Sequence, residues 1–217
     1  MKKTVLDEIF KTYDVRGIYP SQLNEDIAFK IGRVFPEFVG ADVVVVGSDC
    51  RKSTPKLKKA LISGILSAGA DVVDIGLVST PVFYFAVAFW GYPAGIMITA
   101  SHNPPEWNGF KFCREQAIPL SYESGLAQLK KEIQKDYPSK PQGNVIETDV
   151  LPDYIDFLLE RINPDKISKT KLVFDAGNGM GGVAIKKIFE QLTQVDFVGI
   201  NLKPDGNFPH HHPHPLD

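Results

Sequence analysis

Asp42-Val43-Val44-Val45-Val46-Gly47 is a continuous run of β-branched residues that ends at a glycine. Such a run is typical of a strand whose two faces are both covered by helices. Ser53-Thr54-Pro55 follows and predicts a helix start, with the Ser53 hydroxyl as cap and an early proline. Asp71-Val72-Val73-Asp74-Ile75-Gly76 is then expected to be the next strand. A strand, a helix and a second strand in succession predict a right-handed βαβ unit and a parallel sheet.

The same alternation continues along the chain. We expect a helix from Thr80 to Trp90, a buried strand at 94–98, a short strand at 109–113 and an amphipathic helix from Ser121 to Lys135. Strands and helices in this order predict an α/β protein. We expect three-layer α/β/α sandwich domains with mixed, mostly parallel sheets.

A stretch rich in breakers and charge, residues 135–144, indicates a linker or a surface loop. We place a first domain at residues 1–148 and a second domain at residues 149–217. The second is expected to hold helices at 152–161 and 183–192 and strands at 171–175 and 197–200. A two-stranded sheet is marginal by itself, so we expect this second domain to be incomplete.

The composition is that of an ordinary globular protein. The 217 residues are 43% hydrophobic and 23% charged, and the formal net charge of -2 gives no broad basic surface. We therefore expect neither a nucleic-acid nor a membrane partner. The apolar run at 82–90 is too short to cross a bilayer and the charged N-terminus does not resemble an export signal, so we expect a cytoplasmic protein. In that compartment Cys50 and Cys113 are expected to be free thiols.

Thr99-Ala100-Ser101-His102-Asn103-Pro104 follows the strand at 94–98 and places a serine at the end of that strand. Loops at this edge of a parallel sheet hold the reactive groups of many α/β proteins. The simplest alternative is a turn, which is the commonest use of Ser and Asn beside proline. A serine hydrolase is disfavoured, because on extended backbone the Ser101 and His102 side chains would point to opposite sides. No Gly-x-Ser-x-Gly motif surrounds Ser101 either.

A phosphoryl group on Ser101 would need other partners. Cations must neutralise its charge, an acid or base must serve the incoming hydroxyl, and a divalent metal often assists. Arg16, Asp49, Arg51 and Lys111 lie in loops or at strand ends and are the candidates. Taken singly, Arg51 and Lys111 are also explained as surface cations and Asp49 as a helix cap. Their joint presence favours phosphoryl transfer.

Five groups of residues carry a family resemblance. In chain order they are Tyr13-Asp14-Val15-Arg16-Gly17, Gly47-Ser48-Asp49-Cys50-Arg51, Thr99–Pro104 with Asn108-Gly109-Phe110-Lys111, Asp175-Ala176-Gly177-Asn178-Gly179 and residues 204–213. In this order they resemble the α-D-phosphohexomutases, with the best match to the bacterial and archaeal phosphomannomutase/phosphoglucomutase branch. The resemblance implies a mutase that interconverts hexose 1-phosphate and 6-phosphate through a phosphoserine and a bisphosphate intermediate. The implied ligands are hexose phosphates, Mg²⁺ and a hexose 1,6-bisphosphate activator.

The resemblance also implies which residues act in catalysis. Ser101 would be the phosphoserine, and its phosphate would be bridged by the magnesium ion. Lys111 and His102 would flank the reacting hydroxyl as acid–base or electrostatic partners. One fixed metal and several cations suit phosphoryl transfer, which needs little covalent machinery beyond the serine.

The implied substrate- and phosphate-binding residues are Arg16, Asp49 and Arg51. Arg16 would contact phosphate or position the serine loop. Asp49 and Arg51 would support that loop, with Arg51 the better placed of the two to handle phosphate or protons.

The sequence also departs from that family. The Asp-Gly-Asp-Gly-Asp-Arg type loop of the family's metal site is missing, as are the sugar-reading loop of the third domain and the phosphate-gripping fourth domain. Hard divalent ions need several oxygen ligands, so we expect the magnesium site at Ser101 to be incomplete. We therefore expect a fragment with little mutase activity alone. A phosphoglucosamine mutase and a non-catalytic fragment that binds sugar phosphates stay open, as do the preferred hexose and the oligomeric state.

Two further motifs suggest other ligands. Gly177-Asn178-Gly179-Met180-Gly181-Gly182 has the Gly-x-Gly-x-x-Gly spacing of dinucleotide-binding proteins. Asp196 lies at the distance of a ribose-binding acid but at the start of the next strand, so we favour a tight strand-to-helix turn. The histidines between 210 and 214 suggest a metal site. The prolines among them favour an extended chain with diverging side chains, so we favour a family loop or adventitious metal binding.

Overall fold

The computed structural model describes residues 4–214. Within that range the strands are β1 (Val15–Ile18), β2 (Val43–Ser48), β3 (Asp71–Leu77), β4 (Ala94–Ile98), β5 (Trp107–Arg114), β6 (Val145–Glu147), β7 (Thr170–Asp175) and β8 (Val195–Ile200). The α-helices are α1 (Val5–Ile9), α2 (Glu25–Val39), α3 (Thr54–Ser67), α4 (Thr80–Phe89), α5 (Ala127–Glu132), α6 (Leu151–Leu159) and α7 (Gly181–Phe189). Short helical turns are η1 (Glu115–Ala117), η2 (Tyr122–Leu126) and η3 (Pro164–Lys166).

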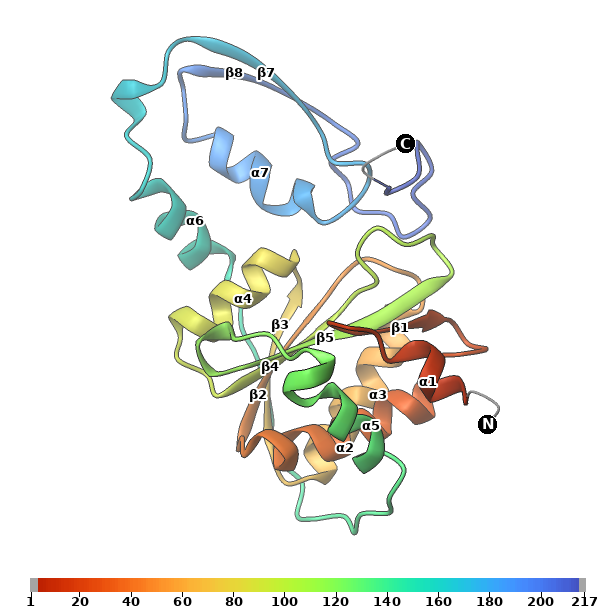
Figure 1. Ribbon diagram of the computed structural model, residues 1–217. Coiled ribbons are helices and arrows are strands. Elements are labelled where there is room, and N and C mark those ends of the chain that lie inside the picture. Colours follow the sequence, from red (N-terminus) through yellow and green to blue (C-terminus); the bar gives the residue numbers. More distant parts are fainter. Residues whose placement is uncertain (1–3, 215–217) are drawn as a thin grey trace.

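Residues 4–148 form a first unit around a six-stranded sheet in the order β1-β5-β4-β2-β3-β6 (Figure 1). β2 pairs in parallel with both β3 and β4, and β3 pairs in parallel with β6. β5 is antiparallel to both of its neighbours. The expected α/β class with a mixed, mostly parallel sheet is therefore confirmed, with β5 as the antiparallel element.

Helices cover both faces of this sheet, as the run of valines in β2 predicts. Val44 and Val46 join the core under α2, α3 and α5, whereas Val45 joins the core under α4. Successive strand residues point to opposite faces, so a strand buried on both sides has no polar alternation.

Two glycines set the close approach of α2 and α3. A Cβ on Gly32 would lie 2.1 Å from the carbonyl oxygen of Leu61, and one on Gly64 would lie 2.2 Å from that of Phe29. Neither neighbour is a flexible side chain. The crossing therefore requires hydrogen at both positions.

Residues 149–214 form a second unit, in which β7 and β8 make a two-stranded parallel sheet beside α7. This unit packs on the first through α6, which meets α4. The ring of Phe85 in α4 lies 5.3 Å from that of Tyr154 and 5.0 Å from that of Phe157. The indole N–H of Trp90 donates to Asp153 Oδ2 at 2.8 Å.

Two local expectations were wrong. Ser53 precedes α3 without a side-chain capping bond, because its hydroxyl accepts from Asn108 Nδ2 instead. The helix expected from Ser121 to Lys135 is broken near Gly125, whose φ is 162°. Residues 135–144, predicted to be a linker or surface loop, have no helix or strand, and β6 follows them and extends the sheet beside β3.

Both cysteines are free thiols, as expected. Among residues 4–214, no helix is long and apolar enough to cross a membrane.

Candidate active site

The serine loop, residues 99–106, connects β4 to β5 at the edge of the first unit's sheet. Ser101 has a φ of 56°, a left-handed conformation that is uncommon for a residue other than glycine. Its N–H donates to Thr99 Oγ1 at 3.0 Å. Its side chain is exposed, whereas Thr99 and Ala100 before it are buried. Strain of this kind is found where surrounding contacts hold a functional residue in place.

This conformation corrects the expected relation of Ser101 to His102. On extended backbone the two side chains would diverge, but the left-handed turn brings Ser101 Oγ and His102 Nδ1 to 3.4 Å. The imidazole is thus within reach of a proton on the serine hydroxyl.

The guanidinium of Arg51 holds the serine loop through hydrogen bonds to backbone carbonyl oxygens. Its Nη1 donates to the carbonyl oxygens of Pro104 and Trp107 at 2.6 and 3.0 Å. Its Nη2 donates to those of Ser101 and Asn103 at 2.9 and 2.7 Å. With a residue exposure of 1%, Arg51 is no surface cation. These contacts give it a loop-holding role, and its contact with phosphate stays a prediction.

Asp49 balances this buried charge. Its Oδ2 lies 3.2 Å from Arg51 Nε, and its Oδ1 accepts from the Arg51 N–H and from the Thr54 hydroxyl, each at 3.0 Å. Burial lowers the pKa of Arg51 from its ordinary value, and the adjacent Asp49 carboxylate opposes that shift. Asp49 supports Arg51, and through it the serine loop.

A second set of cations approaches the loop from β1 and β5. Arg16 Nη1 donates to Asn103 Oδ1 at 2.6 Å and to the Ala100 carbonyl oxygen at 3.3 Å. Asp14 Oδ2 accepts from Arg16 Nε at 2.8 Å and Nη2 at 2.7 Å, and from Lys111 Nζ at 3.2 Å. One carboxylate oxygen therefore holds both predicted cations beside the loop.

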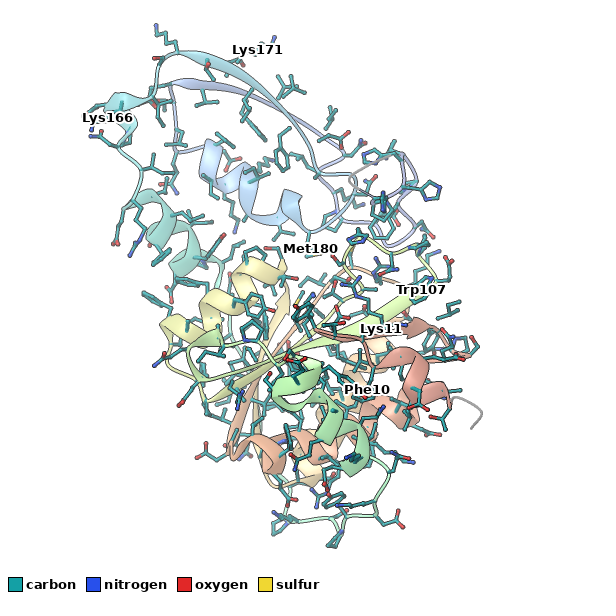
Figure 2. All side chains as sticks on the ribbon, in the orientation of Figure 1. Phe10, Lys11, Trp107, Lys166, Lys171 and Met180 are labelled. Atoms are coloured by element: carbon teal, nitrogen blue, oxygen red, sulfur yellow. The ribbon has the colours of Figure 1, made fainter. Side chains whose placement is uncertain are left out.

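Asp14 is a site residue that the sequence prediction did not single out. It is buried, and antiparallel pairing of β1 with β5 sets Arg16 opposite Gly109, two residues before Lys111. A usable signal was present: Asp14 precedes Arg16 by two positions at the start of a strand, a spacing that places side chains on one face. Lys11 and Trp107 line the same hollow as Arg16 and Lys111 (Figure 2).

A cavity of about 490 Å³ lies between the serine loop and the second unit. Ser101, His102, Asp49 and Cys50 line it from the first unit. The turn 175–180 and the histidines at 211, 212 and 214 line it from the second. Met180, at the start of α7, lies on the side of the second unit that faces the first (Figure 2).

The sequence of this chain matches two models of a known protein family. Residues 7–139 match the model of the phosphoglucomutase/phosphomannomutase α/β/α domain I, and residues 152–217 match that of domain II. The chain belongs to this family. The resemblance to the α-D-phosphohexomutases is thereby confirmed.

Individual relatives agree with the family models. The chain is 38% identical to a phosphomannomutase of Vibrio cholerae and 41% identical to one of Salmonella typhimurium, and 95% of it is covered in both comparisons. A crystal structure of a phosphoglucomutase/phosphomannomutase family protein from Burkholderia thailandensis superposes with a TM-score of 0.87 at 37% identity, covering the full chain. The chain spans about half the length of these relatives, 47% of the curated proteins and 48% of the crystal structure.

The Gly-rich turn at 177–182 packs against a downstream segment of the same chain. A Cβ on Gly177, whose φ is 52°, would lie 2.7 Å from His211 Cε1. Asn178 Nδ2 donates to the Lys203 carbonyl oxygen at 2.9 Å. The turn therefore packs against its own downstream segment, which favours the structural interpretation over a dinucleotide site. Asp196 lies in the first half of β8, as expected.

The magnesium ion at Ser101 stays a prediction. Within the described range 4–214, which includes the histidines at 210, 211, 212 and 214, no three His, Cys, Asp or Glu side chains form a group that could hold a metal ion. Ser101 alone supplies too few oxygen ligands for a hard divalent cation.

Proposed function

We propose that this chain carries the phosphoserine part of a phosphohexose mutase, in which Ser101 takes a phosphoryl group from a hexose bisphosphate and passes it to a hexose phosphate. One observation carries the proposal. Ser101 is exposed in a left-handed loop whose backbone is clamped by a buried arginine, and it faces a cavity large enough for a small ligand. Preorganisation of this kind lowers the cost of positioning a reacting group.

In the proposed step, a hydroxyl oxygen of the hexose phosphate attacks the phosphorus atom on Ser101. The bond between phosphorus and Ser101 Oγ breaks as the new O–P bond forms, and the product is a hexose 1,6-bisphosphate. The hydroxyl proton passes to a base, and Ser101 Oγ regains a proton. His102 Nδ1, at 3.4 Å from that oxygen, is the group we assign to the Ser101 proton.

Charge on the transferring phosphoryl group needs fixed cations. Arg16 and Lys111 are held together by Asp14, and Arg16 also binds the serine loop. We assign both cations to stabilising this charge, with Lys111 as the partner of the hexose hydroxyl. No step in the proposal uses a magnesium ion. Weak turnover by this chain alone is part of the proposal.

The test is phosphorylation of Ser101. The chain is incubated with glucose 1,6-bisphosphate in magnesium buffer, and the peptide that contains Ser101 is analysed by mass spectrometry. We expect one added phosphoryl group, absent in Ser101→Ala. Label at or below the level of that variant would contradict the proposal and support a non-catalytic sugar-phosphate-binding fragment.

Discharge of the label then addresses the substrate. Labelled protein is mixed separately with the 6-phosphates of mannose, glucose and glucosamine, and loss of label is followed with time. Faster loss with the glucosamine compound would favour a phosphoglucosamine mutase over the phosphomannomutase/phosphoglucomutase activity that we propose.

A further inference from the structure

The histidine segment, residues 208–214, lies against the serine loop from the second unit. Just before it, Gly206 packs so closely on the first unit that a Cβ there would lie 2.5 Å from the Cys50 carbonyl oxygen. The Phe208 ring then lies 5.2 Å from the guanidinium carbon of Arg51, the residue that clamps the loop. The segment thus contacts Arg51, the residue whose hydrogen bonds hold the loop around Ser101.

Two contacts fix the segment on its own unit. His210 Nδ1 lies 2.6 Å from Asn178 Oδ1, and His211 Nε2 lies 3.4 Å from Asp175 Oδ2. His211 Nδ1 also lies 2.8 Å from the His212 carbonyl oxygen. The first two histidines therefore serve as attachments.

Three histidines of the segment line the cavity at Ser101. They are His211, His212 and His214, which join His102 there, whereas His210 does not line it. Of the three, His211 is already held by Asp175. The rings of His102 and His214 meet edge to face with 5.4 Å between centroids. Among residues 4–214, the His212 imidazole has no hydrogen bond or ion pair to another side chain.

The acids of this cavity are already engaged. Asp49 accepts from Arg51 and Thr54. Asp175 accepts from the Gly177 N–H at 2.8 Å and from Asn201 Nδ2 at 3.0 Å, beside its contact with His211. An imidazole always offers at least one N–H donor. The side of the cavity around Ser101 therefore offers imidazole donors, and the carboxylates of Asp49 and Asp175 already accept hydrogen bonds from partners of their own.

We propose that His102, His212 and His214 form a binding site for a phosphomonoester group, so that the histidine segment supplies part of the cradle for the phosphoryl group exchanged at Ser101. A phosphomonoester dianion offers only acceptor oxygens, which suits a cavity lined by imidazoles that can donate an N–H. The inference rests on the proposed function for the identity of the ligand. It assigns His212 and His214 as binding residues contributed by the second unit.

The test is a phosphate titration followed by NMR of the histidine ring protons, at neutral pH and constant ionic strength. Inorganic phosphate is the probe, with glucose 6-phosphate as a second probe. We expect saturable shifts at His102, His212 and His214. The double variant H212Q/H214Q should lose at least tenfold in affinity for both probes, whereas His210→Gln, in the same segment but outside the cavity, should stay within twofold.

One further variant keeps the result interpretable. Gly206→Ala retains every histidine but displaces the segment from the Cys50 turn, so it should also weaken phosphate binding. Affinity unchanged in H212Q/H214Q, or shifts confined to residues outside the cavity, would overturn the inference.

The outcome is separable from that of the proposed function. Unchanged phosphate affinity in H212Q/H214Q, with Ser101 still labelled by glucose 1,6-bisphosphate, rejects the histidine site alone. Phosphate binding at the histidines without any label on Ser101 rejects the proposed phosphoserine and leaves the site standing.

Discussion

β2 and β7 are both parallel strands that lead through a turn into a helix, yet their surroundings differ sharply. In β2 every residue after Val43 is buried, because sheet neighbours flank it on both sides and helices cover both faces. In β7 the side chains alternate between exposed and half-buried, and Val173 is 59% exposed. The local pattern fixes the element, whereas the number of neighbouring layers fixes its burial.

This difference divides the site. The serine loop is built on the well-covered sheet and clamped by a buried arginine, whereas the opposing histidine segment is built on the two-stranded unit. Regions with few buried contacts open at lower free energy than core strands. We therefore expect the serine loop to be the fixed wall of the cavity and the histidine segment to be the movable wall, which opens at lower free energy.

The largest expected effect comes from removing the clamp. Arg51→Met leaves three carbonyls of the serine loop, the Trp107 carbonyl and Asp49 without their buried partner, and breaking such a buried pair costs about 3–5 kcal/mol. Urea unfolding followed by circular dichroism measures this loss. Lys52→Met, at the exposed neighbouring position, is the control and should change the free energy of unfolding by less than about 0.5 kcal/mol. A similar small loss in both variants would show that the clamp does not stabilise the first unit.

A matched pair of glycine substitutions tests the division between the units. Gly32→Ala places a Cβ 2.1 Å from a carbonyl oxygen in the first unit, and Gly182→Ala places one 1.9 Å from the Leu202 carbonyl oxygen in the second. Overpacking of this kind costs about 1–3 kcal/mol. By hydrogen exchange, Gly32→Ala should lower the protection of β2 and β4, whereas Gly182→Ala should lower only that of β7 and β8. Equal loss in both units after either change would mean that they unfold as one.

Asp14 offers a test within the fixed wall. Asp14→Asn removes the charge that holds Arg16 and Lys111 together, so labelling of Ser101 by glucose 1,6-bisphosphate should slow by roughly tenfold to a hundredfold, as expected when reacting groups are mispositioned. Circular dichroism checks that the fold is retained. Asp26→Asn, at the exposed start of α2, is the control. Labelling at the wild-type rate would remove Asp14 from the site.

How far the sequence predicts this molecule follows from which features are local. The strand at 42–47 and a loop at 99–104 were predictable, because an apolar run and a Ser-His-Asn-Pro stretch are recognised within a few residues. The burial of Arg51 was not predictable, because nothing in the neighbouring sequence distinguishes an arginine exposed to water from one that donates to four carbonyl oxygens. The contact of His102 with Ser101 depends on a single left-handed residue, and the packing of His211 on Gly177 joins segments 34 positions apart in the sequence, so neither leaves a periodic signal.

Cys50 reports on contact between the two units. Burial, and after it the adjacent Asp49 carboxylate, raises the pKa of this thiol from 9.0 to about 11, and its Sγ lies 3.7 Å from the Asn178 carbonyl oxygen of the second unit. At neutral pH it should therefore hold about a hundredfold less thiolate than an ordinary cysteine and react correspondingly slowly with a disulfide reagent. Gly182→Ala should speed that reaction if the second unit loosens. A fast reaction in the unaltered chain would show that the two units are already apart at this contact. Cys113, whose pKa burial raises to about 12, is the internal reference that should stay slower still.

The smallest effect is expected at the attachment of the histidine segment. The His212 carbonyl oxygen, and after it the Asp175 carboxylate, raise the pKa of His211 above 6.5, while the Gly177 N–H, Asn201 and His211 hold that of Asp175 below 3.8. The His211 contribution is fully present below pH 6.5 and is lost as the pH rises through its folded pKa. The Asp175 contribution is present above pH 3.8 and is lost as the pH falls through its own folded pKa. The histidine segment should thus be held most firmly between these two pH limits and less firmly as the solution becomes alkaline.

An NMR titration of His211 should give a midpoint above 6.5, and this midpoint should fall in Asp175→Asn. Asp165→Asn is the control and should leave the midpoint unchanged, because it lies beside Lys166 at the far end of the unit (Figure 2). An unchanged midpoint in Asp175→Asn would mean that the His211–Asp175 pair does not hold the histidine segment. The contacts of Gly206 and Phe208 alone would then hold it.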